Sequence, residues 1–289
     1  TNRSYNLGVL FQEKRGTGLT HSFFASVLDA FKSAGEKRGY DITFINHHIG
    51  WTGMTYLEHC RYRNVDGVCV VCADFYAPEV IELVDSNLPV VTIDHSFNNR
   101  SCVLSDNIGG LKLLVDAAYQ KGHRKIAYVH GEKSSVTENR IIGFYRAMQE
   151  HGLNVNPDFV VEALYDNPAT SMQAVLNLMD RPDPPTCILL PDDHSTLGAM
   201  QAAKQLNLRV PEDLSLAGYD GIRLTQMLQP RLTTIEQDTK RIGAQAAEFL
   251  IDRIENPRTA GSETATIPVK LLEGESMGIC PVKADAANS

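Results

Sequence analysis

The chain has 289 residues, of which 43% are hydrophobic and 21% are charged, as in a soluble globular protein. A chain of this length is too long for one compact core and predicts two domains of ordinary size. Its formal net charge of −8 argues against a nucleic-acid-binding surface, because neutralising phosphates requires clustered Lys and Arg.

The sequence lacks membrane and secretion signals, and its cysteines favour a reducing compartment. No apolar run approaches membrane-spanning length, and the first residues lack the apolar core of a signal peptide. Cys69 and Cys72 form a C-x-x-C pair, but they lie in an apolar run whose alternation places the two thiols on opposite faces of a strand. We therefore expect buried, reduced thiols in a cytoplasmic protein that has no membrane partner.

The first part of the chain alternates strands with helices. Apolar runs predict the strands, and amphipathic runs predict the helices between them. In chain order we expect a strand at 5–11, a helix at 22–38, a strand at 41–46, a helix at 51–62, a strand at 65–72, a helix at 77–86, and strands at 89–94 and 102–105. This order is typical of a parallel sheet covered by helices.

The same order then repeats. We expect helices at 108–121, 139–151, 171–179, 196–206 and 243–254, and strands at 126–130, near Val160, and at 187–190, 214–217 and 266–272. Two halves with one pattern predict an α/β protein built from two similar doubly wound parallel-sheet lobes, with a ligand cleft between them.

Two aspartates follow strands of the second half. Asp192 comes directly after the strand at 187–190, and Asp220 comes directly after the strand at 214–217 and the pair G-Y. In open α/β sheets, ligands bind at the carboxyl ends of the strands. Ionised carboxylates only accept hydrogen bonds, so two of them suit a neutral ligand rich in hydroxyl donors.

Catalytic, phosphate-binding and metal-binding motifs are missing from the sequence. It contains no G-x-S-x-G, no G-x-x-x-x-G-K-[ST] and no H-E-x-x-H, and the loop at 16–18 lacks the third glycine of a dinucleotide site. His47 and His48 are adjacent on a strand and point apart, which makes a poor metal site. Asp192 and Asp193 also point apart, so one ligand contact and one helix cap is a better interpretation than an acid–base pair. We predict a protein that is not an enzyme and uses no metal or cofactor.

Characteristic motifs are spread over nearly the whole chain. They are V-D-G-V at 65–68, L-P-V-V-T-I-D-H at 88–95, S-D-N-I-G-G at 105–110, G-H-R-K-I-A-Y-V-H-G at 122–131, N-R-I-I-G-F-Y-R-A-M at 139–148, P-D-D-H-S-T-L-G-A-M at 191–200, V-P-E-D-L-S-L-A-G-Y-D at 210–220 and P-R-L-T-T-I-E-Q-D at 230–238. In type, order and spacing this series resembles the lac-repressor (LacI/GalR) family. The resemblance implies the family's effector-binding core, a periplasmic-binding-protein-like fold of type I.

The resemblance also implies domain boundaries. They are 1–104 plus 234–264 for an N-terminal lobe, 105–232 plus 266–280 for a C-terminal lobe, and 281–289 for a disordered tail. The family's DNA-binding headpiece is expected to be absent, because the sequence starts at the first core strand. The loop at 11–19 departs from the family, since it is polar and carries Glu13, Lys14 and Arg15 at one lip of the expected cleft.

Ligand-binding residues carry over from the family's pattern. Arg140, shortly before G-F, resembles the residue that grips ligand hydroxyls or carboxylates. Asp220 matches the aspartate of the family's G-[YF]-D motif. Asp192 matches the polar position that precedes the Asp of its D-D or N-D pair. Asp94 matches the aspartate of its P-V-V-x-[IF]-D strand. Positions that match less closely are His21, Phe24, Ser135 or Ser134, and Tyr165 or Asp166.

From the residues alone, other roles stay open at these positions. Arg140 would otherwise form a surface ion pair, and Asp94 and Asp220 would otherwise serve turns or caps. The combined prediction is the effector-sensing core of a homodimeric transcriptional regulator. It binds a small polar ligand, with a sugar favoured, and contacts operator DNA only through a headpiece outside this chain. The alternative is the solute-binding protein of a sugar transporter.

Overall fold

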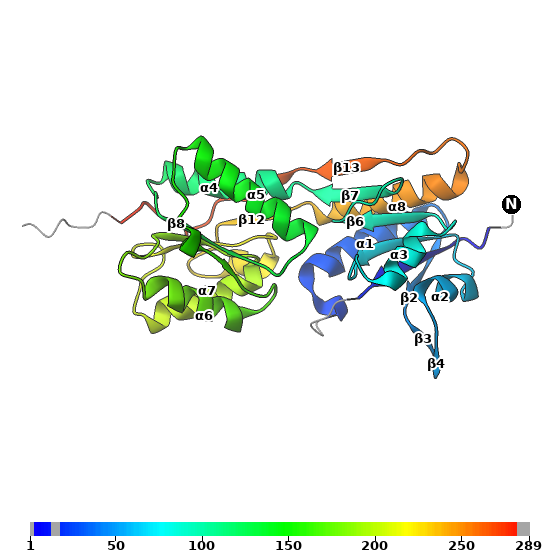
Figure 1. Cartoon of the computed structure of the whole chain (residues 1–289), viewed down its shortest axis with the longest axis horizontal. Helices are drawn as coiled ribbons and strands as arrows, with labels where there is room; N and C mark the ends of the chain where they lie inside the picture. Colours follow the sequence, from blue (N-terminus) through cyan, green and yellow to red (C-terminus); the bar gives the residue numbers. More distant parts are fainter. Residues whose placement is uncertain (1–2, 13–17, 282–289) are drawn as a thin grey trace, which may run out of the picture. The chain divides into compact units, whose positions relative to one another are not determined.

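A computed structural model describes residues 3–12 and 18–281, which form two compact units (Figure 1). The first unit contains Thr1–Ser105 and Asp238–Ile267, and the second contains Asp106–Gln237 and Pro268–Ser289. The predictions for the charged loop residues 13–15 and for the tail from residue 282 lie outside the described residues. Within them, no helix is both long enough and apolar enough to cross a membrane.

The first unit contains a six-stranded parallel sheet. Its strand order is β13-β7-β6-β5-β1-β2. The strands are β1 (Asn6–Phe11), β2 (Asp41–Ile45), β5 (Gly67–Cys72), β6 (Val90–Ile93), β7 (Ser101–Ser105) and β13 (Thr264–Ile267). The helices are α1 (Ser22–Lys37), α2 (Tyr56–Tyr62), α3 (Pro78–Asp85) and α8 (Thr239–Glu255), with a short 3-10 helix η1 (Gly18–Thr20).

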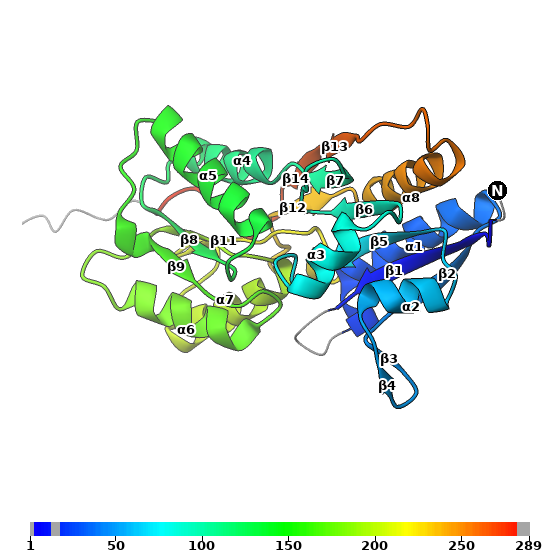
Figure 2. The same ribbon diagram turned by 45° about the vertical axis from the view of Figure 1, so that its right-hand side comes forward.

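Helices cover both faces of this sheet because alternate residues of each strand point to opposite faces. Helices α1 and α8 lie side by side on one face (Figure 2). Phe23, Val27 and Phe31 of α1 form a buried stripe at helical spacing there. Helices α2 and α3 pack on the other face, with Tyr56 and Leu83 in a second cluster. Each face thus has its own apolar core.

The second unit contains a four-stranded parallel sheet with the order β11-β10-β8-β9. The strands are β8 (Ile126–His130), β9 (Val160–Glu162), β10 (Cys187–Leu189) and β11 (Ser215–Ala217); β12 (Thr234–Gln237) and β14 (Val269–Leu272) form an antiparallel pair. Helices α4 (Asn107–Gln120) and α5 (Ser135–Glu150) cover one face, and α6 (Pro168–Met179) and α7 (Asp193–Gln205) cover the other. Two 3-10 helices complete the unit, η2 (Pro157–Phe159) and η3 (Arg223–Met227).

Three departures of the structure from the predictions change which elements are present or which unit they join. The helix predicted at 51–62 begins only at Tyr56, because Thr55 and Glu58 form a capping box there. The residues before it form a small hairpin, β3 (His48–Ile49) and β4 (Thr52–Gly53). The strand predicted at 266–272 is two strands, β13 and β14, separated at Pro268, which has no N–H to donate.

The third departure is β12. The sequence places residues 234–237 in the first lobe, whereas β12 pairs with β14 in the second unit. The chain therefore passes between units after Ser105, after Gln237 and after Ile267.

Close packing of α6 against α7 depends on Gly198. A Cβ atom at this position would lie 1.8 Å from the carbonyl oxygen of Pro168. Because backbone cannot move aside cheaply, Gly198→Ala is expected to destabilise the second unit by about 1–3 kcal/mol. Thermal unfolding measures this loss of stability. Gly261→Ala is the control, because no neighbouring atom lies within 4 Å of the position that its Cβ would take. Equal melting temperatures for both variants would contradict the close α6–α7 contact.

Candidate functional site

Polar and aromatic side chains gather at the carboxyl edge of the second unit's sheet. Gly131 follows β8, Asp192 follows β10 and Asp220 follows β11, so the three parallel strands deliver these residues to one edge. Arg140 reaches this edge from α5, and Tyr165 from the segment after β9.

Arg140 is the central residue of this group. Its side chain is only 4% exposed, and its Nε donates to Oδ1 of Asn107 at 2.8 Å while Nη1 donates to the carbonyl oxygen of Pro191 at 2.8 Å. The guanidinium carbon lies 3.5 Å from the ring centroid of Tyr219 and 5.8 Å from that of Tyr165. Two hydrogen bonds and a stacked ring therefore fix the orientation of the planar guanidinium group.

The carboxyl group of Asp220 lies close enough to Arg140 for the two groups to affect each other's pKa. The backbone of Asp220 has a φ of 108°, in the region that L residues rarely adopt, and its Oδ1 accepts a hydrogen bond from Nε2 of Gln237 at 2.7 Å. Burial among protein atoms and the nearby Asp192 and Asp193 raise the pKa of Asp220 well above its ordinary value, although the positive charge of Arg140 opposes the shift. The residue as a whole is nevertheless only half-buried.

The charge of Arg140 is itself stabilised here. Burial acts to lower its pKa, but the phenols of Tyr165 and Tyr219 and the carboxyl of Asp220 more than offset this, and the pKa of Arg140 is raised. The residue is therefore a permanent cation inside the unit, next to a carboxyl group.

Asp192 serves as the N-cap of α7. Its Oδ1 accepts from the backbone N–H of Ser195 at 2.7 Å, and its Oδ2 accepts from the Ser195 hydroxyl at 2.9 Å and from the backbone N–H of Asp166 at 2.7 Å. Of the two adjacent carboxylates, Asp192 is thus the helix cap, and it also holds the segment that carries Tyr165. Direct ligand contact by Asp192 stays a prediction.

Asp193 is buried in a different network. Its carboxylate accepts from the hydroxyls of Thr234 at 2.5 Å and Thr225 at 3.0 Å and from the backbone N–H of Ile222 at 2.8 Å. Burial raises the pKa of Asp193 to about 7, against the opposing effect of these three hydrogen bonds. This carboxylate joins α7 to η3 and β12 behind the edge where Asp192 and Asp220 lie.

Tyr165 is fixed by its hydroxyl and its backbone. The hydroxyl is hydrogen-bonded to Oγ1 of Thr137 at 2.7 Å, and the backbone N–H donates to Glu132 at 2.9 Å. The ring also lies directly against Gly131, where a Cβ atom would be 2.0 Å from a ring carbon. Only glycine leaves room for the ring at this position.

This contact gives a prediction for Gly131→Ala. The added methyl must displace the Tyr165 ring, so we expect a loss of about 1–3 kcal/mol of stability, measured by thermal unfolding. In a Tyr165→Ala background the added methyl group has no ring to displace. Gly131→Ala should therefore reduce the stability of that variant much less, because the two changes share one contact. Additive losses in the double variant would show that the ring is not what Gly131 accommodates.

The remaining predicted site residues lie elsewhere. Ser135 is the first residue of α5, whereas the hydroxyl of Ser134 is the cap that accepts from the backbone N–H of Thr137. His21, Phe24 and Asp94 belong to the first unit: His21 and Phe24 are ring neighbours at 4.9 Å, and Asp94 follows β6 with a φ of 61°. The structure thus brings Arg140, Tyr165, Asp192 and Asp220 together within one unit. A ligand-binding role for His21, Phe24, Asp94 and Ser135 stays a prediction.

Sequence reasoning missed the partners of Arg140 and Asp220. Asn107 binds the guanidinium, Tyr219 stacks on it, and Gln237 binds Asp220 and is itself only 6% exposed. The Oε1 atom of Gln237 is buried without a hydrogen-bond partner. All three lie in quoted motifs, but a motif does not say which of its residues meet. Among the described residues, no group of three or more His, Cys, Asp or Glu side chains could hold a metal ion.

Comparisons with known proteins agree with this architecture. The family described as periplasmic binding protein-like domain matches residues 115–277. The ribose operon repressor of Haemophilus influenzae is 33% identical over 250 residues, which cover 83% of this chain and 73% of that protein. The transcriptional repressor PurR of Vibrio vulnificus is 33% identical over 255 residues, with the same two coverages.

The chain belongs to the LacI/GalR family of transcriptional regulators.

A solved structure has the same fold. A LacI family transcriptional regulator from Enterococcus faecium, determined with bound ribose, has a TM-score of 0.80 and 23% identity, covering 95% of this chain and 99% of that one. The periplasmic-binding-protein-like α/β fold predicted for this LacI/GalR family member is therefore confirmed.

Proposed function

We propose that this chain is the effector-sensing core of a transcriptional regulator and that its second unit binds a neutral sugar. The observation that carries the proposal is the pairing of the buried Arg140 with the carboxyl group of Asp220, whose pKa is raised and whose residue is only half-buried, beside the ring of Tyr219. The ribose operon repressor among the relatives supports the same ligand class.

The hydrogen-bonding capacity of this pair matches a sugar. An arginine only donates, whereas a carboxyl group of raised pKa accepts and, when protonated, also donates. Neighbouring sugar hydroxyls donate and accept in the same way, so one can bind Arg140 while the next binds Asp220. Gln237 donates to Oδ1 of Asp220 and so orients this carboxyl group for such a ligand.

The surrounding charge favours a neutral ligand over an anion. Asp192, Asp193 and Asp220 follow the ends of two neighbouring strands, and Arg140 is the cation whose charge acts on Asp220. A phosphate or carboxylate would be repelled by negative charge on the carboxyl groups at this edge, whereas a neutral sugar carries no charge to be repelled. A purine is the second ligand class to test, because PurR proteins are relatives of similar identity.

The regulator is proposed to act in the cytoplasm as a homodimer that catalyses no reaction, with operator DNA bound through a headpiece. The relatives are named as repressors, which favours regulation over the alternative of a transporter's solute-binding protein. Binding alone does not regulate: the sugar must have different affinities for the DNA-competent and DNA-incompetent states.

Thermal-shift titration tests the ligand. Ribose, glucose, ribose 5-phosphate and hypoxanthine are the probes, and a ligand that binds only the folded state raises the melting temperature. We expect a shift with a neutral sugar that disappears in Asp220→Asn and persists in the control Asp213→Asn, whose carboxylate forms an exposed pair with Arg209 at 2.8 Å. A shift confined to hypoxanthine or to the phosphate would overturn the sugar assignment.

A further inference from the structure

The residues that lead into β1 are held by side chains from two other parts of the first unit. The backbone N–H groups of Ser4 and Tyr5 donate to the two carboxylate oxygens of Asp66, at 2.9 and 2.8 Å. Arg3 lies beside Glu255: its Nη2 donates to the backbone carbonyl oxygen at 3.2 Å, and its Nη1 is 3.6 Å from Oε1. Arg3, Ser4 and Tyr5 are called the entry segment below.

Two features of this region run against local conformational and electrostatic preferences. Tyr5 has a φ of 56°, in the left-handed region that is unfavourable for a bulky side chain. Glu255 is the last residue of α8, where a negative charge lies next to the unpaired carbonyl groups of the helix end. Unfavourable features of this kind persist where the surrounding structure enforces them, and they gather at functional sites. Their coincidence here indicates a function for the entry segment.

The carboxylate of Glu255 joins the entry segment to the end of α1 as well. Its Oε2 pairs with Nη2 of Arg38, the residue that follows α1, and its Oε1 accepts from the hydroxyl of Tyr40 at 3.4 Å. Burial raises the pKa of Tyr40 to about 12, and the charge of Glu255 adds to this effect, so the hydroxyl keeps its proton and donates. The ring of Tyr40 lies 5.3 Å from that of Tyr5.

Helices α1 and α8 are held together along their length. The hydroxyls of Ser26 and Thr239, near the beginning of each helix, are 2.7 Å apart. Farther along, Leu250 of α8 is buried in the same apolar cluster as Val27 of α1. The two helices meet again at Glu255. Since α8 has 17 residues and is therefore about 25 Å long, it is a rigid connection between its two ends.

The other end of α8 follows directly from the proposed ligand site. Gln237 donates from Nε2 to Oδ1 of Asp220 at 2.7 Å. The next residue, Asp238, is the N-cap of α8 and accepts from the backbone N–H of Arg241 at 3.0 Å. A partner of the ligand-site carboxyl group thus immediately precedes the cap of the helix whose last residue is Glu255.

We propose that Glu255 holds the entry segment in place and that α8 links this contact to the ligand site, so that a sugar bound at Asp220 changes how firmly Arg3 is held. Glu255 is then a positioning residue for the segment through which the chain continues to a headpiece. The inference rests on the proposed function and assigns a route to the regulation of its site. It requires the sugar to bind with different affinities when the entry segment is held and when it is released.

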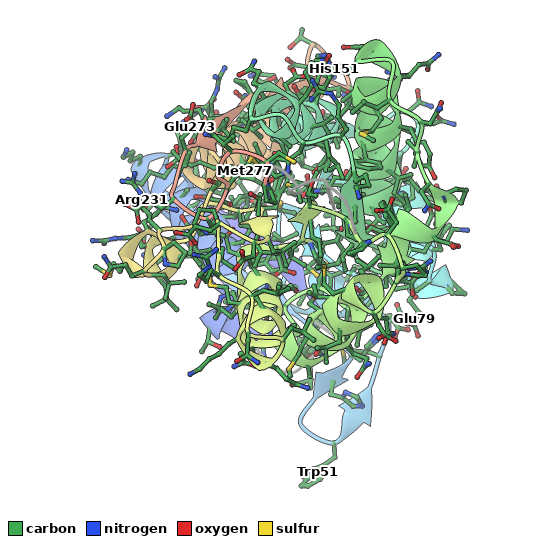
Figure 3. The ribbon with its side chains drawn as sticks, turned by 90° about the vertical axis from the view of Figure 1, so that its left-hand side faces the viewer. Trp51, Glu79, His151, Arg231, Glu273 and Met277 are labelled. Atoms are coloured by element: carbon green, nitrogen blue, oxygen red, sulfur yellow. The ribbon has the colours of Figure 1, made fainter. Side chains whose placement is uncertain are left out.

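Trypsin cleavage after Arg3 measures the contact, because the protease must take this side chain into its own pocket. Release of the peptide of residues 1–3 is followed by mass spectrometry of the folded chain. Glu255→Gln removes the ion pair and should speed release at least threefold. Glu79→Gln is the control, since it makes the same change at an exposed carboxylate of α3, which Figure 3 shows at the surface. Equal rates for Glu255→Gln and the original protein would overturn the proposal.

Sugar titration tests the link through α8. With the sugar found in the screen, the release rate of the original protein should change at least threefold, whereas that of Glu255→Gln should stay constant at equal sugar affinity. Asp66→Asn weakens the hold on Ser4 and Tyr5 without changing α8. It should be cleaved faster and should keep its response to the sugar. A response that survives in Glu255→Gln would contradict the role of α8.

A double-mutant cycle tests the same link without a ligand. Asp220→Asn changes the acceptor of Gln237 and should alter the release rate, and in a Glu255→Gln background this effect should vanish, because both changes act through one helix. Additive effects of the two changes would overturn the link. A non-additive cycle in a chain that binds none of the probes would refute the ligand assignment and leave the link in place, so the two proposals fail separately.

Discussion

Replacing Arg140 by alanine is expected to weaken sugar binding by at least about tenfold, which corresponds to about 1.5 kcal/mol for the loss of one charge-assisted hydrogen bond. The effect has two sources. The ligand loses its cationic donor, and Asp220 loses the positive charge that opposes the rise in its pKa. Isothermal titration with the sugar found in the screen measures the change.

Two matched variants make this result specific. Arg140→Lys keeps the charge but loses the planar fork, so it should recover only part of the affinity. Arg181→Ala removes a half-buried arginine of the same unit, paired with the exposed Asp158 at 2.8 Å, and should bind like the original protein. Because Arg140 also binds Asn107 and the Pro191 carbonyl, circular dichroism must show that each variant is folded. Full affinity in folded Arg140→Ala would remove this residue from the site.

The second large effect is a pH dependence of stability that originates at Asp193. Its pKa is about 7 in the folded protein and 3.8 ordinarily, so between these values the folded state holds a proton that the unfolded state releases. The unfolding free energy contributed by this group therefore decreases as pH rises through that window. At about 1.4 kcal/mol per pKa unit, the loss amounts to about 4 kcal/mol by pH 7 and changes little above it.

Asp193→Asn should abolish this slope, because an amide does not titrate. Hydrogen exchange of peptides covering α7 and β12, followed from pH 5 to pH 8, measures local opening where Asp193 binds Thr234. The stability of the original protein relative to the variant should fall over this range. Asp213→Asn is the control of opposite sign: its carboxylate has a pKa lowered to about 2 by hydrogen bonds from Arg209, so its contribution is lost only in stronger acid. Parallel pH profiles for the original protein and Asp193→Asn would show that this carboxyl group stays ionised.

Several features of the site were accessible from the sequence because they are local. The aspartates at 192 and 220 directly follow apolar strand runs, and parallel strands bring their ends to one edge whatever the details of packing. Family motifs supplied Arg140 and Tyr165. The structure places all four in one unit, although the ends of the strands point only to the two aspartates.

Other features required the folded chain. Arg140 and Asn107 are 33 residues apart, and Asp193 and Thr234 are 41 apart, so neither pair has a spacing that marks it in the sequence. The assignment of Asp192 as the helix cap depends on the N–H groups of Ser195 and Asp166, which converge only in the tertiary structure. The hairpin at 48–53 is too short for hydrophobic periodicity to reveal, and the helix predicted at 51–62 overlapped its second strand.

The sequence by itself determined the alternation of strands and helices, the family and the strand-end aspartates, because each depends on periodicity or on contiguous motifs. The tertiary structure alone decided which polar groups pair, which carboxyl groups are buried enough to change their pKa, and which unit β12 joins. These properties depend on atoms brought together from distant parts of the chain, and no local pattern encodes them.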